Sequence, residues 1–293
     1  MQANTAPRLG VLGRIANEHQ VPAFAALTLA WSWAAWLPLS LGVIDAGGTT
    51  NPLVFVGGFG PPVAAVVVTW LTGRRVRSFL REALHWRVAP RWYLAALALP
   101  VAYLTIPNGA VYAFLGRSFE VSALLRRLPQ LPLALVALAL VGGGQEELGW
   151  RGFALDRLQS RYGPVPATLG LGVLWACWHL PLFLTPWHHS NVPFPAYLLI
   201  VVGTAFVFTW LYNVTGSVLV TMLLHGTNNV ASGMVPIPAS EALSAPFPLS
   251  AVVGQVIGVW IPVAVLLLLV GSSLGYSGRE RATTEPTGAA EPA

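Results

Sequence analysis

Two adjacent glutamates, Glu146 and Glu147, lie in an apolar stretch of this sequence, and Arg151 follows Glu147 by four residues. An ionisable group at the centre of a membrane span costs at least ~2.5 kcal/mol, so it usually faces a cavity or a partner and serves a function. Glu147 and Arg151 share one helical face and can pair, which is also their plain structural interpretation. Glu146 is rotated by about 100° from Glu147. It has no sequence-local cation on its face and is the candidate for a general base.

Two more pairs of residues have the same four-residue spacing. Trp175 precedes His179, which places an indole ring one helical turn from an imidazole. His225 precedes Asn229, and both of these side chains can donate a hydrogen bond to an oxygen. Taken alone, His179 is interpreted as a packed histidine, and His225 with Asn229 as a polar pair that joins two helices.

Together these residues supply what peptide hydrolysis requires: a base for water, a proton donor for the leaving amine, and hydrogen-bond donors for the oxyanion. Cys177 points about 160° away from His179 on a helix, and the zinc-protease motif H-E-x-x-H is absent, so activated water is the expected nucleophile. No cofactor is expected. Zinc or another divalent metal is the alternative, with Glu146, His179 and His225 as ligands. Because Asn229 is a poor zinc ligand and a good oxyanion donor, we favour the metal-free interpretation.

The composition predicts that membrane helices carry these residues. Of the 293 residues, 55% are hydrophobic and 9% are charged, whereas a soluble domain has roughly 25% charged residues. A bilayer core requires roughly 20 apolar helical residues. The sequence predicts an all-α, polytopic transmembrane helix bundle of about eight spans, with the active site among spans four to seven. The predicted spans are 22–44, 51–72, 92–115, 131–150, 164–184, 195–213, 214–233 and 249–271.

The predicted organisation is one transmembrane domain over residues 22–271, between a cytoplasmic segment 1–21 and a disordered cytoplasmic tail 272–293. Segment 1–21 lacks an apolar core followed by a small-residue cleavage site, so no removable signal peptide is expected. Only a short break near Gly216 separates spans six and seven, and seven spans would result if these two fused.

All sixteen basic residues are arginines, and the eight-span topology places thirteen of them on the side of the termini. This bias predicts cytoplasmic termini and an inner (plasma) membrane location. The arginines do not form a soluble basic module with interleaved aromatic residues, so no nucleic-acid partner is expected. Six arginines lie in segment 74–91, which is predicted to be an interfacial helix that anchors the topology or, alternatively, docks anionic lipid or substrate.

The three pairs resemble the three motifs of the CAAX prenyl endoprotease and bacteriocin-processing (CPBP, or Abi) family of intramembrane proteases. These motifs read Glu-Glu-x-x-x-Arg at 146–151, Trp-x-x-x-His at 175–179 and His-x-x-x-Asn at 225–229. Gly-Phe-Gly-Pro-Pro at 58–62 is also similar to an early Gly-Pro element of the family. The resemblance covers one region, and its motifs are specific only in combination.

The resemblance implies that Glu146 activates water, while Glu147 supports it and pairs with Arg151. It implies that His179 orients the water or passes on its proton. His225 and Asn229 are implied to stabilise the oxyanion. The family has been viewed both as metal-dependent and as a metal-free glutamic protease.

One departure from the family pattern concerns the substrate pocket. The family usually has Phe where this chain has Trp175, and the larger ring would narrow the pocket. Prenylated CAAX substrates belong to the eukaryotic branch, whereas a lysine-free sequence rich in Ala, Gly, Pro and Arg suggests a GC-rich bacterium. The expected partner is therefore a membrane-associated peptide or protein within the lipid bilayer.

Two other functions remain open for the same residues. A proton- or cation-coupled transporter would use Glu146, His179 and His225 as an ion path. The polar groups cluster in one half of the chain, however, and lack the counterpart that inverted repeats would supply. A catalytically inactive scaffold or immunity protein would keep the fold and bind partners.

Overall fold

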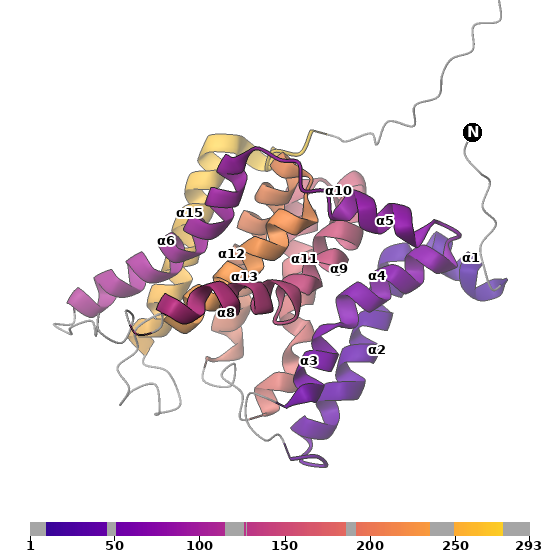
Figure 1. Cartoon of the computed structure of the whole chain (residues 1–293), viewed down its shortest axis with the longest axis horizontal. Helices are drawn as coiled ribbons and strands as arrows, with labels where there is room; N and C mark the ends of the chain where they lie inside the picture. The colour runs from indigo at the N-terminus through magenta and orange to yellow at the C-terminus, as the bar shows by residue number, and fades with distance from the viewer. Residues whose placement is uncertain are drawn as a thin grey trace, which may run out of the picture.

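The computed structural model of this chain describes residues 10–45, 51–114, 126, 128–185, 192–234 and 249–277. Every regular element within these residues is helical, and the helices pack against one another in one bundle (Figure 1). The predicted all-α class is therefore confirmed.

The α-helices of the described residues differ widely in length. They are α1 (Val11–Glu18), α2 (Gln20–Ser40), α3 (Pro52–Gly58), α4 (Gly60–Leu71), α5 (Val76–Ala83), α6 (Pro90–Phe114), α8 (Leu131–Leu140), α9 (Glu147–Gly149), α10 (Asp156–Tyr162), α11 (Pro164–Trp178), α12 (Phe194–Thr215), α13 (Val218–Met234) and α15 (Leu249–Val270). Three helical segments with other hydrogen-bond patterns adjoin these α-helices. They are the 3₁₀ turns Gly144–Glu146 and Leu180–Leu184 and the π-helix Trp150–Leu155.

Six helical stretches of the described residues are long and apolar enough to cross a membrane. Helices α6 and α13 occupy the predicted third and seventh spans, but α13 has only 17 residues and α6 does not belong to the six. Helix α12 ends at Thr215, where Gly216 adopts a left-handed conformation with φ of 62°. Spans six and seven therefore form separate helices, while the count of eight stays a prediction.

The predicted fourth span, 131–150, is not one continuous helix. Helix α8 ends at Leu140, and the chain turns through Gly143, whose φ of 129° disfavours residues with a side chain. Helical structure resumes at Gly144 and continues through Tyr162. The three consecutive glycines read as part of an apolar run in the sequence, yet they separate α8 from the segment that carries the glutamates (Figure 1).

The Gly-Phe-Gly-Pro-Pro element interrupts the second predicted span between α3 and α4 and lies against the glutamate segment. A Cβ atom added at Gly149 in α9 would approach the backbone of Pro61 to 2.6 Å. The amide nitrogen of Gln145 also donates a hydrogen bond to the carbonyl of Gly58 at 3.3 Å. The absence of a side chain at Gly149 thus lets α9 approach α4 closely enough to fix the glutamates relative to the second span.

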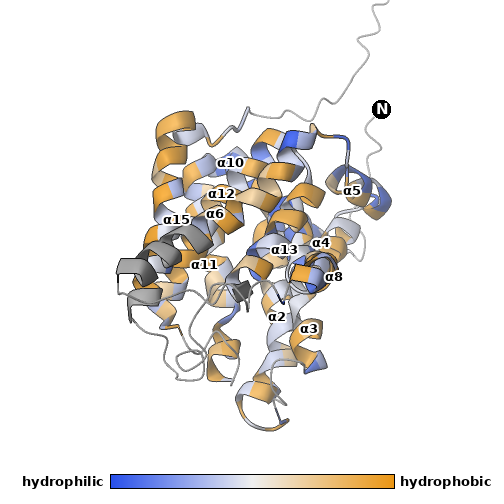
Figure 2. Ribbon diagram, turned by 60° about the vertical axis from the view of Figure 1, so that its left-hand side comes forward, coloured by the Kyte–Doolittle hydropathy of each residue, from blue (hydrophilic) through white to orange (hydrophobic). Residues whose placement is uncertain are grey.

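The arginine-rich segment forms a short amphipathic helix at one end of the bundle. In α5, Phe79 and Ala83 are buried whereas Arg77 and Arg81 are exposed. Figure 2 shows this helix as hydrophilic ribbon, in contrast with the hydrophobic ribbon of α15. This is the arrangement expected of a helix that lies at a membrane interface.

The two predicted flanking segments are described only in part. Residues 10–21 include α1. After the C-terminal helix α15, the 3₁₀ turn Gly271–Ser273 is followed by Leu274, which is fully buried. Six residues of the predicted tail, 272–277, are thus among the described residues. The remainder of that tail, 278–293, lies outside the described residues.

Cytoplasmic termini are a prediction that a reporter fusion tests. Thirteen of the sixteen arginines lie on the side of the termini in the eight-span topology, so a fluorescent or other cytoplasm-active reporter fused after residue 293 is expected to be active. An alkaline phosphatase fusion at the same position, which works only in the periplasm, is expected to be silent. Phosphatase activity there would contradict the topology.

Candidate active site

The two glutamates have different partners in the structure. Nη1 of Arg151 donates to Oε1 and Oε2 of Glu147 at 3.0 and 2.9 Å, and both side chains are completely buried. The i, i+4 pair predicted from the sequence is therefore formed. Glu147 is a carboxylate within the protein interior that is paired with the Arg151 guanidinium.

Arg151 in turn is enclosed by aromatic rings. Its guanidinium carbon lies 5.0 Å from the ring centroid of Trp175 and 4.8 Å from that of Phe208. Its Nε and Nη2 atoms are buried and have no hydrogen-bond partner among the described residues. The aromatic faces provide the favourable electrostatic contact that these donors otherwise lack.

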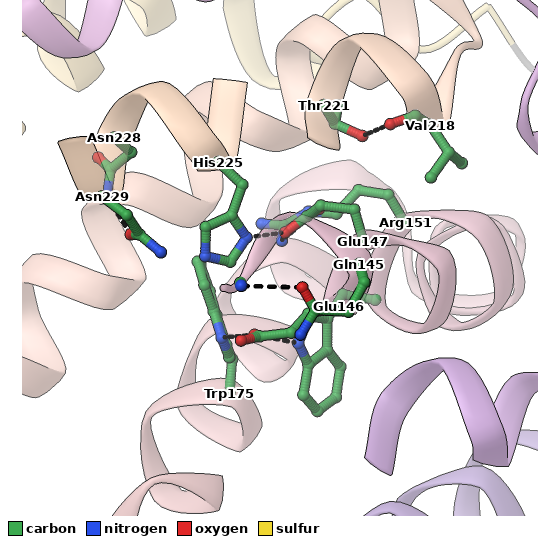
Figure 3. Close-up of polar contacts among 12 residues, drawn as sticks. Gln145, Glu146, Glu147, Arg151, Trp175, Val218, Thr221, His225, Asn228 and Asn229 are labelled. Atoms are coloured by element: carbon green, nitrogen blue, oxygen red, sulfur yellow. Dashed lines mark hydrogen bonds and ion pairs between the residues drawn. The ribbon is translucent and has the colours of Figure 1, made fainter. Parts of the chain in front are cut away.

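His225 joins the Glu147–Arg151 pair from α13. Its Nδ1 atom lies 2.8 Å from Oε1 of Glu147, across 78 residues of sequence (Figure 3). An ionised carboxylate only accepts hydrogen bonds, so Nδ1 of His225 is the donor. The Trp175 ring packs edge-on against the imidazole with centroids 5.3 Å apart. Glu147 thereby holds both Arg151 and His225 in fixed orientations.

Glu146 faces indole groups, and no cation of the described residues forms an ion pair with it. The Nε1 atoms of Trp150 and Trp175 donate to the same oxygen, Oε2, at 3.2 and 3.0 Å (Figure 3). The expected rotation of Glu146 away from the Glu147–Arg151 pair is thus observed, since the two carboxylates bond to different neighbours. Glu146 lies within electrostatic range of His225 and of Tyr197 in α12.

His179 lies at the end of α11, where the helix changes into the 3₁₀ turn. Its Nδ1 atom lies 3.0 Å from the carbonyl oxygen of Trp175, which can only accept, so Nδ1 carries the hydrogen. In the neutral form Nε2 is then the nitrogen that can accept a proton. The imidazole packs edge-on against Trp178 and Tyr197, at 4.5 and 5.6 Å between centroids. Tyr197 therefore borders both His179 and the surroundings of Glu146.

Asn229 lies one turn beyond His225 and contacts the glycine turn that precedes the glutamates. Its Nδ2 atom donates to the carbonyl oxygen of Gly142 at 2.8 Å. A Cβ atom added at Gly143 would clash with Nδ2 of Asn229 and Nε2 of His225. The two predicted oxyanion donors consequently point at one place, and the glycine backbone lies directly against it.

The described residues do not fit the alternative metal site. They contain no group of three or more His, Cys, Asp or Glu side chains placed to hold one ion. Glu147 is bonded to Arg151 and His225, and the bonded oxygen of Glu146 faces two indole donors. The chemistry derived below accordingly uses side chains alone.

One serine matches the letters of a nucleophile motif without its surroundings. Residues 271–275 read Gly-Ser-Ser-Leu-Gly, in the pattern G-x-S-x-G. Ser273 is exposed at the end of α15, and its hydroxyl donates to the carbonyl of Val270. That position is a helix terminus, whereas the motif requires a strand-to-helix turn beside a histidine.

Two residues of the site did not emerge from the sequence. Trp150 stands four residues after Glu146, the same spacing as Glu147 and Arg151, and that spacing was the available signal. Gln145 accepts a hydrogen bond from the backbone of Gly143 while it donates to Gly58. It thus ties the glycine turn to the break between α3 and α4, a contact with no local sequence signal.

Comparison with known proteins agrees with the region that holds the site. Residues 128–231 match the family model described as type II CAAX prenyl endopeptidase Rce1-like. This region of the chain is therefore similar to the CAAX prenyl endopeptidases. The CAAX prenyl protease 2 of Methanococcus maripaludis is 38% identical over 89 residues, or 30% of this chain. That match covers 31% of the relative's own length.

The matched region, 128–231, contains all seven residues that the motifs singled out, because these lie between positions 146 and 229. The apolar helices, together with this likeness to membrane proteases, indicate a multi-pass membrane protein. The likeness to the curated relative is confined to about a third of each chain. The roles of the individual site residues therefore rest on their geometry.

Proposed function

We propose that this protein is an intramembrane endopeptidase that hydrolyses a peptide bond of a membrane-associated peptide or protein with water activated by Glu146. The observation that carries the proposal is the contrast between the two buried glutamates. Glu147 is neutralised by Arg151, whereas Glu146 is held by uncharged donors and keeps one oxygen, Oε1, outside those bonds. A carboxylate in that situation can accept a proton.

In the proposed reaction Glu146 removes a proton from water as the oxygen attacks the peptide carbonyl carbon. The carbonyl oxygen becomes an oxyanion in the tetrahedral intermediate. The C–N bond then breaks, and the proton held by Glu146 passes to the leaving amine, so the carboxylate is regenerated. His179, whose Nε2 can accept a hydrogen bond, orients the water or relays its proton.

The proposed oxyanion site lies between His225 and Asn229. Because Nδ1 of His225 already donates to Glu147, the ring can donate from Nε2 only as an imidazolium. With that cation and Arg151, the charges of the two glutamates are balanced. Asn229 needs no change of protonation, because its Nδ2 already donates a hydrogen bond, at present to the carbonyl oxygen of Gly142. The carbonyl oxygen of the substrate would take the place of this acceptor. Donors aimed in advance at the developing charge are an effective form of catalysis.

The proposal is tested with purified protein in detergent and a fluorogenic membrane peptide, with and without a strong chelator. Cleavage that persists at full rate in the chelator is the expected result. Loss of cleavage that added zinc restores would contradict the metal-free mechanism. Absence of cleavage across a library of membrane peptides would contradict the endopeptidase itself, and ion flux in proteoliposomes would then favour a transporter.

A further inference from the structure

The carboxylate of Glu146 is held by two indole groups that come from different parts of the chain. Trp150 begins the π-helix directly after α9, and Trp175 lies in the last turn of α11. Both Nε1 atoms bond to Oε2, at 3.2 and 3.0 Å, and all three side chains are buried (Figure 3). No donor among the described residues bonds to the other oxygen, Oε1.

Two donors on one oxygen determine the orientation of the whole group. A single hydrogen bond leaves a carboxylate free to rotate about its last bond, whereas two donors from separate helices restrict that rotation. Reacting groups must be held within about 10–20° of the productive geometry to act efficiently. The arrangement fixes Oε2 as the anchored oxygen, and it fixes the direction in which Oε1 points.

The chemical type of the two donors suits a base. A cation bonded to the carboxylate, as Arg151 is to Glu147, holds the group in its charged form and makes it a weaker proton acceptor. An indole N–H has no charge and only donates. It can therefore orient Glu146 with a smaller loss of basicity than a guanidinium would cause.

We propose that Trp150 and Trp175 are positioning residues that anchor Oε2 of Glu146, so that Oε1 takes the proton from the attacking water. This inference rests on the proposed function. Phenylalanine in place of Trp175 would have no N–H to donate. The two indoles act through Glu146, although the Trp175 ring also packs against the imidazole of His225.

A nearby tryptophan argues against a merely structural explanation. Buried indole N–H groups usually find an acceptor, and Glu146 could simply serve as one. Trp178 is equally buried and packs against Trp150 with ring centroids 5.7 Å apart. Its Nε1 has no acceptor in the part of the chain that the structure describes. This interior therefore tolerates an unpaired indole N–H. The need of two buried indole N–H groups for an acceptor therefore does not by itself explain why both bond to the same oxygen of Glu146.

The variants Trp150→Phe and Trp175→Phe test the proposal, with Trp178→Phe as the matched control. Each change removes one indole N–H and the same ring volume from a buried site. Trp178 also borders His179, so the control reports any effect of lost volume on the site. Each test variant is expected to lower kcat about tenfold with KM within about twofold, since a 1 Å misplacement can cost about 10²-fold. The control is expected to change kcat by about twofold or less.

Equal losses of kcat in all three variants, or losses that appear only in KM, would overturn the positioning role. A spectroscopic measurement tests the anchor independently of activity. In protein labelled with ¹⁵N-tryptophan, the indole resonances of Trp150 and Trp175 are expected to shift in Glu146→Leu, while that of Trp178 stays nearly constant. Glu146→Gln, which keeps an acceptor oxygen, should shift them less and serves if the leucine variant does not fold.

The outcomes separate this inference from the function on which it rests. An active wild-type protein whose test variants match the control would overturn the positioning role and leave the endopeptidase standing. An inactive wild-type protein would contradict the endopeptidase and with it the catalytic reason for the anchor. If the indole resonances of Trp150 and Trp175 stay unchanged in the Glu146 variants, the two indoles do not anchor Glu146, whatever the activity of these variants.

Discussion

Replacing Glu146 by glutamine is expected to reduce the rate of peptide cleavage by about 10²- to 10⁴-fold, the range that general-base catalysis contributes. Glutamine has nearly the same shape, and its carbonyl oxygen can still accept hydrogen bonds from Trp150 and Trp175. Expression and melting temperature should therefore change little. Single-turnover cleavage and thermal unfolding in the same detergent measure the two properties.

Asp156→Asn is the matched control for that experiment. Asp156 begins α10, beyond the site in the same helical segment, and its Oδ2 atom accepts a hydrogen bond from Tyr212 at 2.9 Å. The substitution makes the same chemical change, from carboxylate to carboxamide. It is expected to leave cleavage within about twofold of wild type, as for most changes away from the reacting groups. A Glu146→Gln variant no slower than this control would contradict the assignment of the base.

The parts of the site predicted from sequence were those set by helical geometry. The pairing of Glu147 with Arg151 follows from four-residue spacing, and so does the separate orientation of Glu146. Both predictions require only the rotation of about 100° between successive residues of a helix. They hold although the predicted span around them is broken, because the break at Gly143 comes before the glutamates.

The parts that sequence could not provide depend on contacts between distant segments. The bond between His225 and Glu147 joins residues 78 positions apart, and that between Trp175 and Glu146 joins residues 29 apart. Helical periodicity contains no information about which helices become neighbours. The end of α8 was missed for a different reason, since glycine is compatible with an apolar membrane span as well as with a turn.

The Glu147–Arg151 pair is expected to respond to substitution in a different way from Glu146. Glu147→Gln leaves the buried guanidinium of Arg151 without its anion. Removing one partner of a buried ion pair costs about 3 to 5 kcal/mol, so both stability and activity should fall. His225 would also lose the charge of the carboxylate to which its Nδ1 donates.

The double variant Glu147→Gln/Arg151→Gln completes a thermodynamic cycle. It contains no unpaired buried charge at these positions, so it is expected to be more stable than Glu147→Gln alone, although it loses the packing of Arg151 between two rings. Melting temperatures and cleavage rates of the four proteins measure the coupling. Activity should not return with stability, because His225 still lacks its carboxylate. If Glu146→Gln proved active while a stable Glu147→Gln variant was inactive, the roles of the two glutamates would have to be exchanged.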